Sequence, residues 1–305
     1  MQKKPLLICI VGPTAIGKTA LSIKVAEHFS CDIISADSRQ FYKEMTIGTA
    51  VPNKEELEAV KHHFIQDRSI LNPYSVGDFE KDAIKKLDDL FKKNAIAVMV
   101  GGSGLYIDAV VKGLDEFPEV PQYIREVLNR DFQEKGIEYL QNELQKKDAE
   151  YFNKVDLNNH HRVIRALEIC RSQNKTYSSF LKSKPKLRAF KTIYIGLEAP
   201  REVVYDRINQ RVDHMITDGL IEEAKSLFIH KNKNALQTVG YREVFDFMEG
   251  IATKEETISN IKKNTRRFAK RQGTWFRKNK NINWFNYKTS TLEIFNYIER
   301  IHTIT

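Results

Sequence analysis

Cysteine is scarce in this sequence, and long apolar runs are missing. The 305 residues include three cysteines, Cys9, Cys31 and Cys170, which are far apart and lie among apolar residues. Because no Cys-x-x-Cys pair and no cysteine and histidine cluster occurs, the pattern argues against a structural zinc site and favours buried free thiols in a reducing compartment. No run reaches the roughly eighteen apolar residues that a membrane helix needs. We therefore expect a cytoplasmic protein with no membrane partner.

The overall composition is that of a folded protein. Hydrophobic residues make up 41% of the chain and charged residues 29%, with a formal net charge of +9. These proportions exclude collagen-like, mucin-like and disordered chains. The length is about twice that of a typical domain, so we expect one large domain or two unequal ones.

Apolar runs and helical spacings alternate along the first third of the chain. Residues 6–11, 32–36 and 95–100 are short apolar runs typical of buried parallel strands. Residues 18–29 and 79–91 carry apolar side chains at helical spacing. This alternation predicts an α/β fold in which helices flank a parallel sheet.

Strand patterns disappear in the middle of the chain and then return. Helical segments follow one another from Pro118 to about residue 188, whereas residues 191–197 read as a strand and Pro200 opens a long helix. We therefore predict an all-helical insertion domain at 118–188. The core domain would comprise residues 1–117 and 189–305.

A glycine loop follows the first predicted strand. Residues 12–19, Gly-Pro-Thr-Ala-Ile-Gly-Lys-Thr, fit the pattern G-x-x-x-x-G-K-[ST] of the P-loop, the ATP-binding motif. Its backbone N–H groups and the following helix N-terminus cradle phosphate oxygens, while Lys18 adds a positive charge. The Thr19 hydroxyl can hold Mg²⁺ or a phosphate. The predicted fold is therefore P-loop NTPase-like, although the loop binds a diphosphate whether or not a phosphate is transferred.

An aspartate follows the second predicted strand, whereas the later strands lack a convincing Walker-B acid. Residues 95–100 run into Gly101-Gly102-Ser103-Gly104, and Glu198 comes only after its strand has ended. Since the carboxyl ends of neighbouring parallel strands share one crevice, Asp37 should face the phosphate loop and could accept a proton from an attacking nucleophile. A helix N-cap is the structural alternative for Asp37.

Other polar groups have weaker individual signals. Arg207 and Arg211 lie four residues apart on one helix face, where they could clamp a diphosphate or form surface ion pairs. The glycines at 101–104 could allow a ligand close to the backbone or make a tight turn. The pair His62-His63 is more typical of a structural role than of catalysis.

Positive charge gathers near the end of the chain. Residues 262–280 hold nine lysines and arginines and no acid, which matches the entire net charge. Ile258, Ile261, Thr265, Phe268 and Trp275 recur at helical spacing and predict a narrow buried stripe. Uniform charge over several turns favours a helix that binds a polyanion, with nucleic acid preferred over a plain solvated surface.

Taken together, these segments resemble the tRNA dimethylallyltransferase (tRNA isopentenyltransferase) family. The resemblance rests on ordered motifs along most of the chain: 12–19, Asp-Ser-x-Gln at 37–40, Ile-Gly-Thr-Ala at 47–50, 62–63, Val-Gly-Gly-Ser-Gly-Leu-Tyr at 100–106, His-Arg-Val-Ile-Arg-Ala-Leu-Glu at 161–168, the Arg207/Arg211 helix, Val-Gly-Tyr-Arg-Glu at 239–243, and Ala-Lys-Arg-Gln with Thr-Trp-Phe-Arg inside 265–277. It implies transfer of a dimethylallyl group from dimethylallyl diphosphate to N6 of the adenosine 3′ of the anticodon.

The resemblance also implies roles for single residues. Lys18, Thr19 and Arg211 would stabilise the leaving diphosphate, with Mg²⁺ on Thr19, and Asp37 would accept the N6 proton. Diphosphate binding is expected at Gly12, Pro13, Thr14, Ala15, Ile16, Gly17, Lys18, Thr19, Arg207 and Arg211. Contacts with tRNA are expected at Asp37, Ser38, Arg39, Gln40, Ser103, His161, Arg162, Val163, Ile164, Arg165, Lys270 and Arg271. Ser38 and Gln40 would read or orient the adenine edge.

Several positions depart from the family pattern. Ser103 replaces the usual threonine and keeps its hydroxyl, Lys61 replaces a proline, and Asn159 replaces an aspartate, which puts the detailed tRNA contacts of the insertion in doubt. The zinc finger of eukaryotic relatives is absent, which indicates a bacterial-type enzyme. We expect a monomer with no protein partner.

Three other functions remain open from the sequence. A small-molecule or nucleoside kinase would use the same loop to transfer phosphate, but leaves the basic segment without a role. A non-catalytic RNA-binding protein would have no need for Lys18, Thr19 and Asp37 together. A prenyltransferase acting on free adenine nucleotides shares the chemistry, whereas the insertion and the basic segment favour tRNA.

Overall fold

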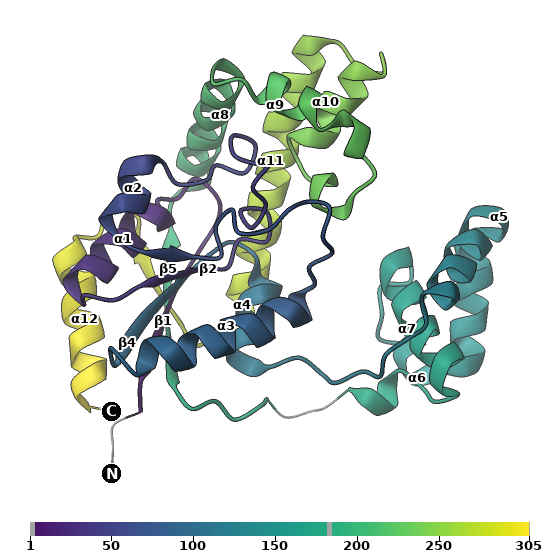
Figure 1. Cartoon of the computed structure of the whole chain (residues 1–305), viewed down its shortest axis with the longest axis horizontal. Helices are drawn as coiled ribbons and strands as arrows, with labels where there is room; N and C mark the ends of the chain where they lie inside the picture. The colour runs from purple at the N-terminus through teal and green to yellow at the C-terminus, as the bar shows by residue number, and fades with distance from the viewer. Residues whose placement is uncertain (1–3, 182–184, 305) are drawn as a thin grey trace. The chain divides into compact units, whose positions relative to one another are not determined.

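The computed structural model describes residues 4–181 and 185–304, and it forms two compact units. Within the described ranges, the first unit combines residues 1–112 with 188–305, and the second comprises residues 113–187 (Figure 1). The sequence predicts the insertion at 118–188, whereas the helical unit comprises residues 113–187. Residues 113–117 therefore belong to the helical unit and not to the core. The Phe117 ring stacks on Tyr177 of that unit at a centroid distance of 4.7 Å.

The first unit is built on a sheet of six parallel strands in the order β3-β2-β4-β1-β5-β6. The strands are β1 (Leu6–Val11), β2 (Ile33–Ser35), β3 (His62–His63), β4 (Ile96–Val100), β5 (Lys191–Glu198) and β6 (Ile282–Asn286). β1 lies in the middle, and all six of its residues are buried. The loops after β1, β2 and β4 therefore meet at one edge of the sheet.

Helices cover both faces of this sheet, because alternate side chains of β1 pack against two different sets of helices. Leu7, Cys9 and Val11 pack with residues of α3 (Val76–Phe91), α4 (Gly104–Lys112) and α11 (Lys254–Arg277). The intervening residues Leu6, Ile8 and Ile10 pack with α1 (Lys18–His28) and α12 (Thr291–Ile304). Successive side chains of a strand point to opposite faces, so one buried strand joins the two halves of the core. The fold is P-loop NTPase-like, as predicted.

The remaining helices of this unit are short or follow β5. They are α2 (Lys54–Ala59), α8 (Arg201–Thr217), α9 (Leu220–Ser226), α10 (Tyr241–Met248) and the single turns η2 (Phe228–His230) and η3 (Asn234–Leu236). The predicted strands and helices of the core are found with ends shifted by a few residues. The elements without a prediction include the strands β3 and β6 and the helices α4, α9, α10 and α12. The two strands lie at the sheet edges and are short, so their sequence pattern is weak.

The basic stretch differs from its prediction in extent and in its buried face. The helix begins at Lys254, where Thr253 and Glu256 form a capping box, and ends at Arg277. Its buried residues are Thr257, Ile261, Ala269, Gln272 and Phe276, whereas Phe268 and Trp275 are 38% and 37% exposed. Of the predicted stripe, Ile261 is buried and Ile258 and Thr265 are half-buried. The prediction was wrong at the two aromatic positions, since Ala269, Gln272 and Phe276 form the buried face there.

The second unit is helical throughout its regular structure. It contains α5 (Gln122–Lys147), α6 (Ala149–Phe152), α7 (His160–Gln173) and η1 (Ser178–Phe180), with a kink in α5 at Gly136, whose φ is 77°. Leu128, Leu140, Leu144, Val163 and Leu167 form its own apolar core. The buried carboxylate of Glu168 pairs with Arg125 and Arg165 and ties α5 to α7.

Two further predictions concern the whole chain. The three cysteines are buried and free, as expected, and burial raises the pKa of Cys31 to about 12, which keeps it protonated. No helix in the described ranges is long and apolar enough to cross a membrane.

Candidate active site

The phosphate loop joins β1 to α1 in a backbone conformation that its glycines permit. Gly12 has φ 143° and Gly17 φ 106°, and a Cβ atom on Gly12 would lie 2.7 Å from the Leu197 carbonyl oxygen. The backbone N–H groups of residues 15–17 donate no hydrogen bond to any described residue. With the start of α1, these groups form an anion cradle.

Lys18 is fastened inside this cradle. Its Nζ donates to the Pro13 carbonyl oxygen at 2.8 Å. Burial lowers the pKa of Lys18 to about 8, an effect that nearby Asp37 opposes and Arg211 reinforces. An anion bound in the loop would restore the full charge of the ammonium group, so proton and anion binding are coupled here.

The two arginines of α8 reach the loop but do different things. Arg211 lines the cavity, and its Nη1 lies 3.4 Å from the Thr14 hydroxyl. Arg207 donates to the Ile16 carbonyl oxygen at 3.3 Å and lies over the Tyr287 ring. Arg207 does not line the cavity, so the predicted clamp is divided: Arg211 faces the anion site and Arg207 supports the loop.

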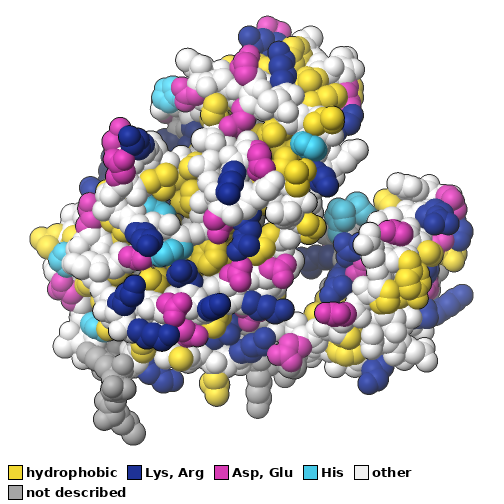
Figure 2. Space-filling view, viewed as in Figure 1, with side chains coloured by type: hydrophobic (Ala, Val, Ile, Leu, Met, Phe, Trp, Pro, Cys, Tyr) yellow, Lys and Arg dark blue, Asp and Glu magenta, His cyan; other side chains and the backbone are white. Residues whose placement is uncertain are grey.

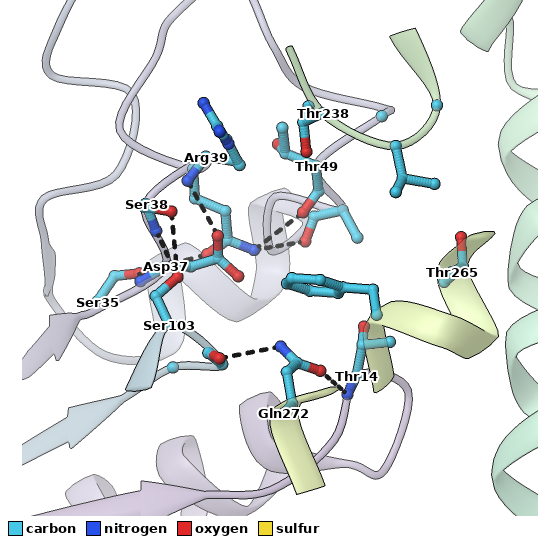
Figure 3. A pocket seen from close by; sticks show the side chains of 18 of the residues that line it. Thr14, Ser35, Asp37, Ser38, Arg39, Thr49, Ser103, Thr238, Thr265 and Gln272 are labelled. Carbon is cyan, nitrogen blue, oxygen red and sulfur yellow. Dashed lines mark hydrogen bonds between the residues drawn. The ribbon is translucent and has the colours of Figure 1, made fainter. Parts of the chain in front are cut away.

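Asp37 follows β2 and lines the same cavity as Lys18 and Thr19 of the loop. Its Oδ1 accepts from the Arg39 N–H at 3.0 Å, and its other oxygen makes no hydrogen bond to a described residue. The segment that follows is a turn and not a helix, so the N-cap alternative for Asp37 is wrong. Ser103 Oγ accepts from the Ser38 N–H and lies 3.1 Å from the Ser38 hydroxyl, which joins the ends of β2 and β4 (Figure 3).

Arg39 and Gln40 hold neighbouring loops. The Gln40 amide donates to the carbonyl oxygens of Thr49 and Ala50 at 3.2 and 2.9 Å. Arg39 Nη1 donates to the carbonyl oxygens of Asn234 and Ala235. Both amide hydrogens of Gln40 are therefore occupied by backbone carbonyl oxygens of the protein.

Gln272 lines the cavity and joins two of its loops, although the sequence assigned no role to this residue beyond its place in the Ala-Lys-Arg-Gln motif. Its Oε1 accepts from the Thr14 N–H at 2.9 Å, and its Nε2 donates to the Gly102 carbonyl oxygen at 3.0 Å (Figure 3). The side chain is 5% exposed, and a Cβ atom on Gly102 would lie 2.1 Å from Nε2. A Cβ on Gly104 would meet Trp275 in the same way. These glycines thus admit side chains of α11, where the sequence reasoning had considered a ligand.

One cavity of about 590 Å³ unites these groups. Thr14, Lys18, Thr19 and Arg211 line it beside Asp37 and Ser103. Apolar side chains also line it, from Val212, Met215, Leu220, Val239 and Phe268. The cavity can therefore take a ligand with one anionic and one apolar part.

His62 is a second lining residue without a predicted role. Its Nδ1 lies 2.8 Å from the Val60 carbonyl oxygen, and its buried Nε2 has no partner among the described residues. Burial lowers the pKa of His62, so the ring is neutral and Nε2 is an acceptor. His63 pairs with Asp32 at 2.8 Å, in keeping with the structural role expected of it.

The predicted tRNA-contact residues of the insertion differ in accessibility. Val163 and Ile164 are buried in the core of the helical unit at 0% and 3% exposure. Their side chains cannot contact RNA, which corrects the prediction for these two positions. Arg162 lies on α7, and the neighbouring His161 is exposed, whereas Arg165 is partly exposed and bound to Glu168.

Metal donors are few in this site. The described ranges contain no cluster of three or more histidine, cysteine, aspartate or glutamate side chains that could hold a metal. The cavity offers the Thr19 hydroxyl and the Asp37 carboxylate. Such a donor set suits Mg²⁺, which commonly keeps several waters and binds through substrate phosphates and one or two protein oxygens.

Comparison with known proteins agrees with this geometry. A family model described as IPP transferase matches residues 40–279. The chain belongs to this family. A tRNA dimethylallyltransferase of Christiangramia forsetii is 61% identical over 96% of this chain and 97% of its own length. One from Flavobacterium johnsoniae is 54% identical over 96% of each chain.

Solved structures of the family have the same fold. The tRNA isopentenylpyrophosphate transferase of Bacillus halodurans superimposes with a TM-score of 0.74 at 36% identity, covering 99% of this chain and 97% of that one. A eukaryotic dimethylallyltransferase acting on tRNA gives a TM-score of 0.79 at 25% identity, over 93% of this chain and 74% of that one.

Proposed function

We propose that this protein transfers the dimethylallyl group of dimethylallyl diphosphate to N6 of the adenosine 3′ of the anticodon in tRNA. The observation that carries the proposal is a single cavity that joins a phosphate loop, apolar walls and an aspartate with one unpaired oxygen. Family membership and the names of the relatives support the same chemistry.

The phosphate loop suits a leaving diphosphate. In the reaction the C1–O bond of the diphosphate breaks, and its electron pair goes to the diphosphate oxygen. The free N–H groups of residues 15–17, Lys18 and Arg211 would stabilise that growing negative charge. No phosphoryl group is transferred, so the absence of a Walker-B acid after β4 does not impair this function.

Asp37 suits the role of general base. The N6 nitrogen forms the new bond to C1 and must lose a proton, which the unpaired oxygen of Asp37 would accept. Lys18 and Asp37 line the same cavity, so the proton acceptor and the leaving-group site share one space. The acceptor base has to leave its stack to enter this cavity, as it does in other enzymes that modify bases.

Mg²⁺ would be held by the Thr19 hydroxyl together with the diphosphate. When bound, the ion supplies further charge neutralisation of the leaving group. His161, Arg162 and Arg165 of the helical unit, with Lys270 and Arg271 of α11, would contact the tRNA. We propose that the enzyme acts as a monomer, and a tRNA substrate implies the cytoplasm.

The test uses labelled dimethylallyl diphosphate with Mg²⁺ and either unmodified tRNA carrying adenosine after the anticodon or free AMP. We expect label in tRNA alone. Asp37→Asn should lower the rate about 10²- to 10⁴-fold, the usual contribution of a general base. Asp88→Asn, an exposed carboxylate on α3, is the matched control and should leave the rate unchanged.

The alternative functions give different outcomes. Label in AMP but not in tRNA would assign the enzyme to free nucleotides. Absence of label from both acceptors, together with ATP turnover when small acceptors are added, would disprove prenyl transfer and support a kinase.

A further inference from the structure

A second hollow lies between α10 and the first half of α11, beside the active-site cavity. Its volume is about 440 Å³, and it shares Gln237 and Arg242 with that cavity. Figure 1 shows α10 and α11 next to each other in the same part of the first unit. An extended ligand that leaves the active-site cavity past Arg242 would therefore enter this hollow directly.

Three basic side chains line this hollow: Arg242, Lys263 and Arg267. All three are exposed, and none forms an ion pair with a carboxylate in the described part of the chain. Lys263 Nζ donates to the Asn260 amide oxygen at 2.6 Å, and Arg267 Nη1 to the Asn264 amide oxygen at 3.4 Å. The neutral asparagines orient the two cations without cancelling their charge.

Two carboxylates also line the hollow, and one of them is already satisfied. Glu243 is 5% exposed; its Oε2 accepts from the Gly240 N–H at 2.8 Å and its Oε1 from the Asn264 amide at 2.7 Å. Asn264 thus bridges Glu243 and Arg267. Asp246 is exposed on α10. The three basic side chains therefore share the hollow with one solvated carboxylate, Asp246, and one carboxylate that already accepts two hydrogen bonds, Glu243.

The neighbouring cations on the same helix are used differently. Lys262 Nζ pairs with Asp213 at 2.5 Å, and Arg266 Nη1 donates to the Asn209 amide oxygen at 2.7 Å. Both partners belong to α8. Lys262 and Arg266 therefore bind side chains of α8, whereas the adjacent Lys263 and Arg267 line the hollow. On the face in Figure 2, acidic and basic side chains are otherwise interspersed over the first unit.

We propose that this hollow binds a phosphodiester group of the RNA whose adenosine enters the neighbouring cavity. The inference rests on the proposed function and adds a contact site to it. Lysine and arginine side chains are the usual ligands of backbone phosphates, and such contacts position an RNA without reading its sequence. Asn260 and Asn264 supply the fixed orientation that a solvated charge run lacks.

The experiment measures binding of an unmodified anticodon stem-loop RNA to the full-length protein at several salt concentrations. The test variant is Lys263→Ala/Arg267→Ala, and the matched control is Lys262→Ala/Arg266→Ala, which removes the same charge from the same two turns. We expect the test pair to weaken binding about tenfold and to reduce the salt slope by about 0.7, the value for one lost phosphate contact on a single strand. The control pair should change binding less than about twofold.

A second measurement locates the contact. Each loop phosphate is replaced in turn by a neutral methylphosphonate. One or two replacements should weaken binding to the wild type and to the control pair, but not to the test pair. Equal losses for the two pairs would overturn the proposal, because the charges would then act from a distance. A phosphate scan without such a position would overturn it as well.

Prenyl transfer is followed in the same preparations at saturating RNA. If the wild type prenylates the RNA while both pairs bind it equally, only the phosphate site is disproved. If the wild type neither binds nor prenylates RNA, the proposed function is disproved together with it.

Discussion

The phosphate loop presents backbone N–H groups to the active-site cavity, whereas α11 presents side chains. The loop is made by residues 12–19, which are consecutive in the sequence. Gln272 of α11 contacts Thr14 and Gly102, which are far from it and from each other along the chain. The same cavity therefore depends on one region whose chemistry is local and on another whose chemistry exists only after folding.

The two regions differ in how clearly the sequence marks them. The loop is recognisable because its backbone shape requires glycines at fixed spacing. Gln272 looks like one more polar residue in a basic stretch, and only its two partners make it part of the site. Mutations in the two regions should accordingly differ in what they disturb and by how much.

The largest effect is expected at Lys18 in the loop. Lys18→Ala removes the positive charge beside the leaving diphosphate, and we expect kcat/KM to fall about 10³-fold, as for the loss of a donor that stabilises transition-state charge. Lys24→Ala removes an exposed lysine from the same helix and is the control. The assay is label transfer to tRNA at varied dimethylallyl diphosphate. A loss below tenfold for Lys18→Ala would contradict the assigned role.

Gln272 should have the next largest effect. Gln272→Ala leaves the Thr14 N–H and the Gly102 carbonyl oxygen without their partner at a nearly buried position. We expect the free energy of unfolding to fall by about 1–3 kcal/mol, because both groups lose their buried partner, and kcat/KM to fall because the phosphate loop is no longer held by α11. Gln210→Ala, on the exposed face of α8, should be neutral.

Gln272→Glu distinguishes the two hydrogen bonds. Glutamate can still accept from Thr14 but cannot donate to Gly102, and its charge would repel a diphosphate. We expect KM for dimethylallyl diphosphate to rise more in this variant than in Gln272→Ala. Equal KM values in the two variants would show that the loop contact does not depend on the charge at this position.

The titration of Lys18 in the loop predicts that the affinity for dimethylallyl diphosphate depends on pH. Because burial lowers the pKa of Lys18 to about 8, the free enzyme loses this charge as the pH rises above that value. A bound diphosphate favours the protonated form, so affinity should weaken at higher pH. From pH 7.5 to 9 we expect the dissociation constant of dimethylallyl diphosphate to rise about eightfold, as one titrating proton requires. A constant value up to pH 9.5 would contradict this pKa.

The smallest effect is expected at Trp275, on the exposed side of α11. Its indole N–H donates to Asp108 at 3.0 Å and its ring covers Gly104. Trp275→Phe keeps the ring but loses the hydrogen bond, which at such a site contributes about 0.5–1.5 kcal/mol. We expect KM for tRNA to rise about threefold, measured beside Trp284→Phe in β6 as the control. An unchanged KM would show that the hydrogen bond from Trp275 to Asp108 does not contribute to tRNA binding.

Much of the core unit was predictable because its signals are local. The apolar runs of β1, β2, β4 and β5 are short and buried on both faces, as parallel strands require. The edge strands β3 and β6 gave weak signals, since their side chains are only partly buried. The position of Asp37 in the cavity could be predicted from the geometry of a parallel sheet. The hydrogen bonds of the Gln40 amide could not, because they depend on the folded loop at residues 49–50.

The parallel sheet, the phosphate loop and the aspartate after β2 can be predicted from the sequence, because each depends on residues that are consecutive in the chain. Which polar side chains are available for chemistry depends on the folded structure. Gln40 and Arg207 hold backbone carbonyl oxygens, Gln272 joins two loops, and Lys262 is paired while Lys263 is not. A hydrogen bond needs a partner at the correct distance, and folding alone brings that partner from a remote part of the chain.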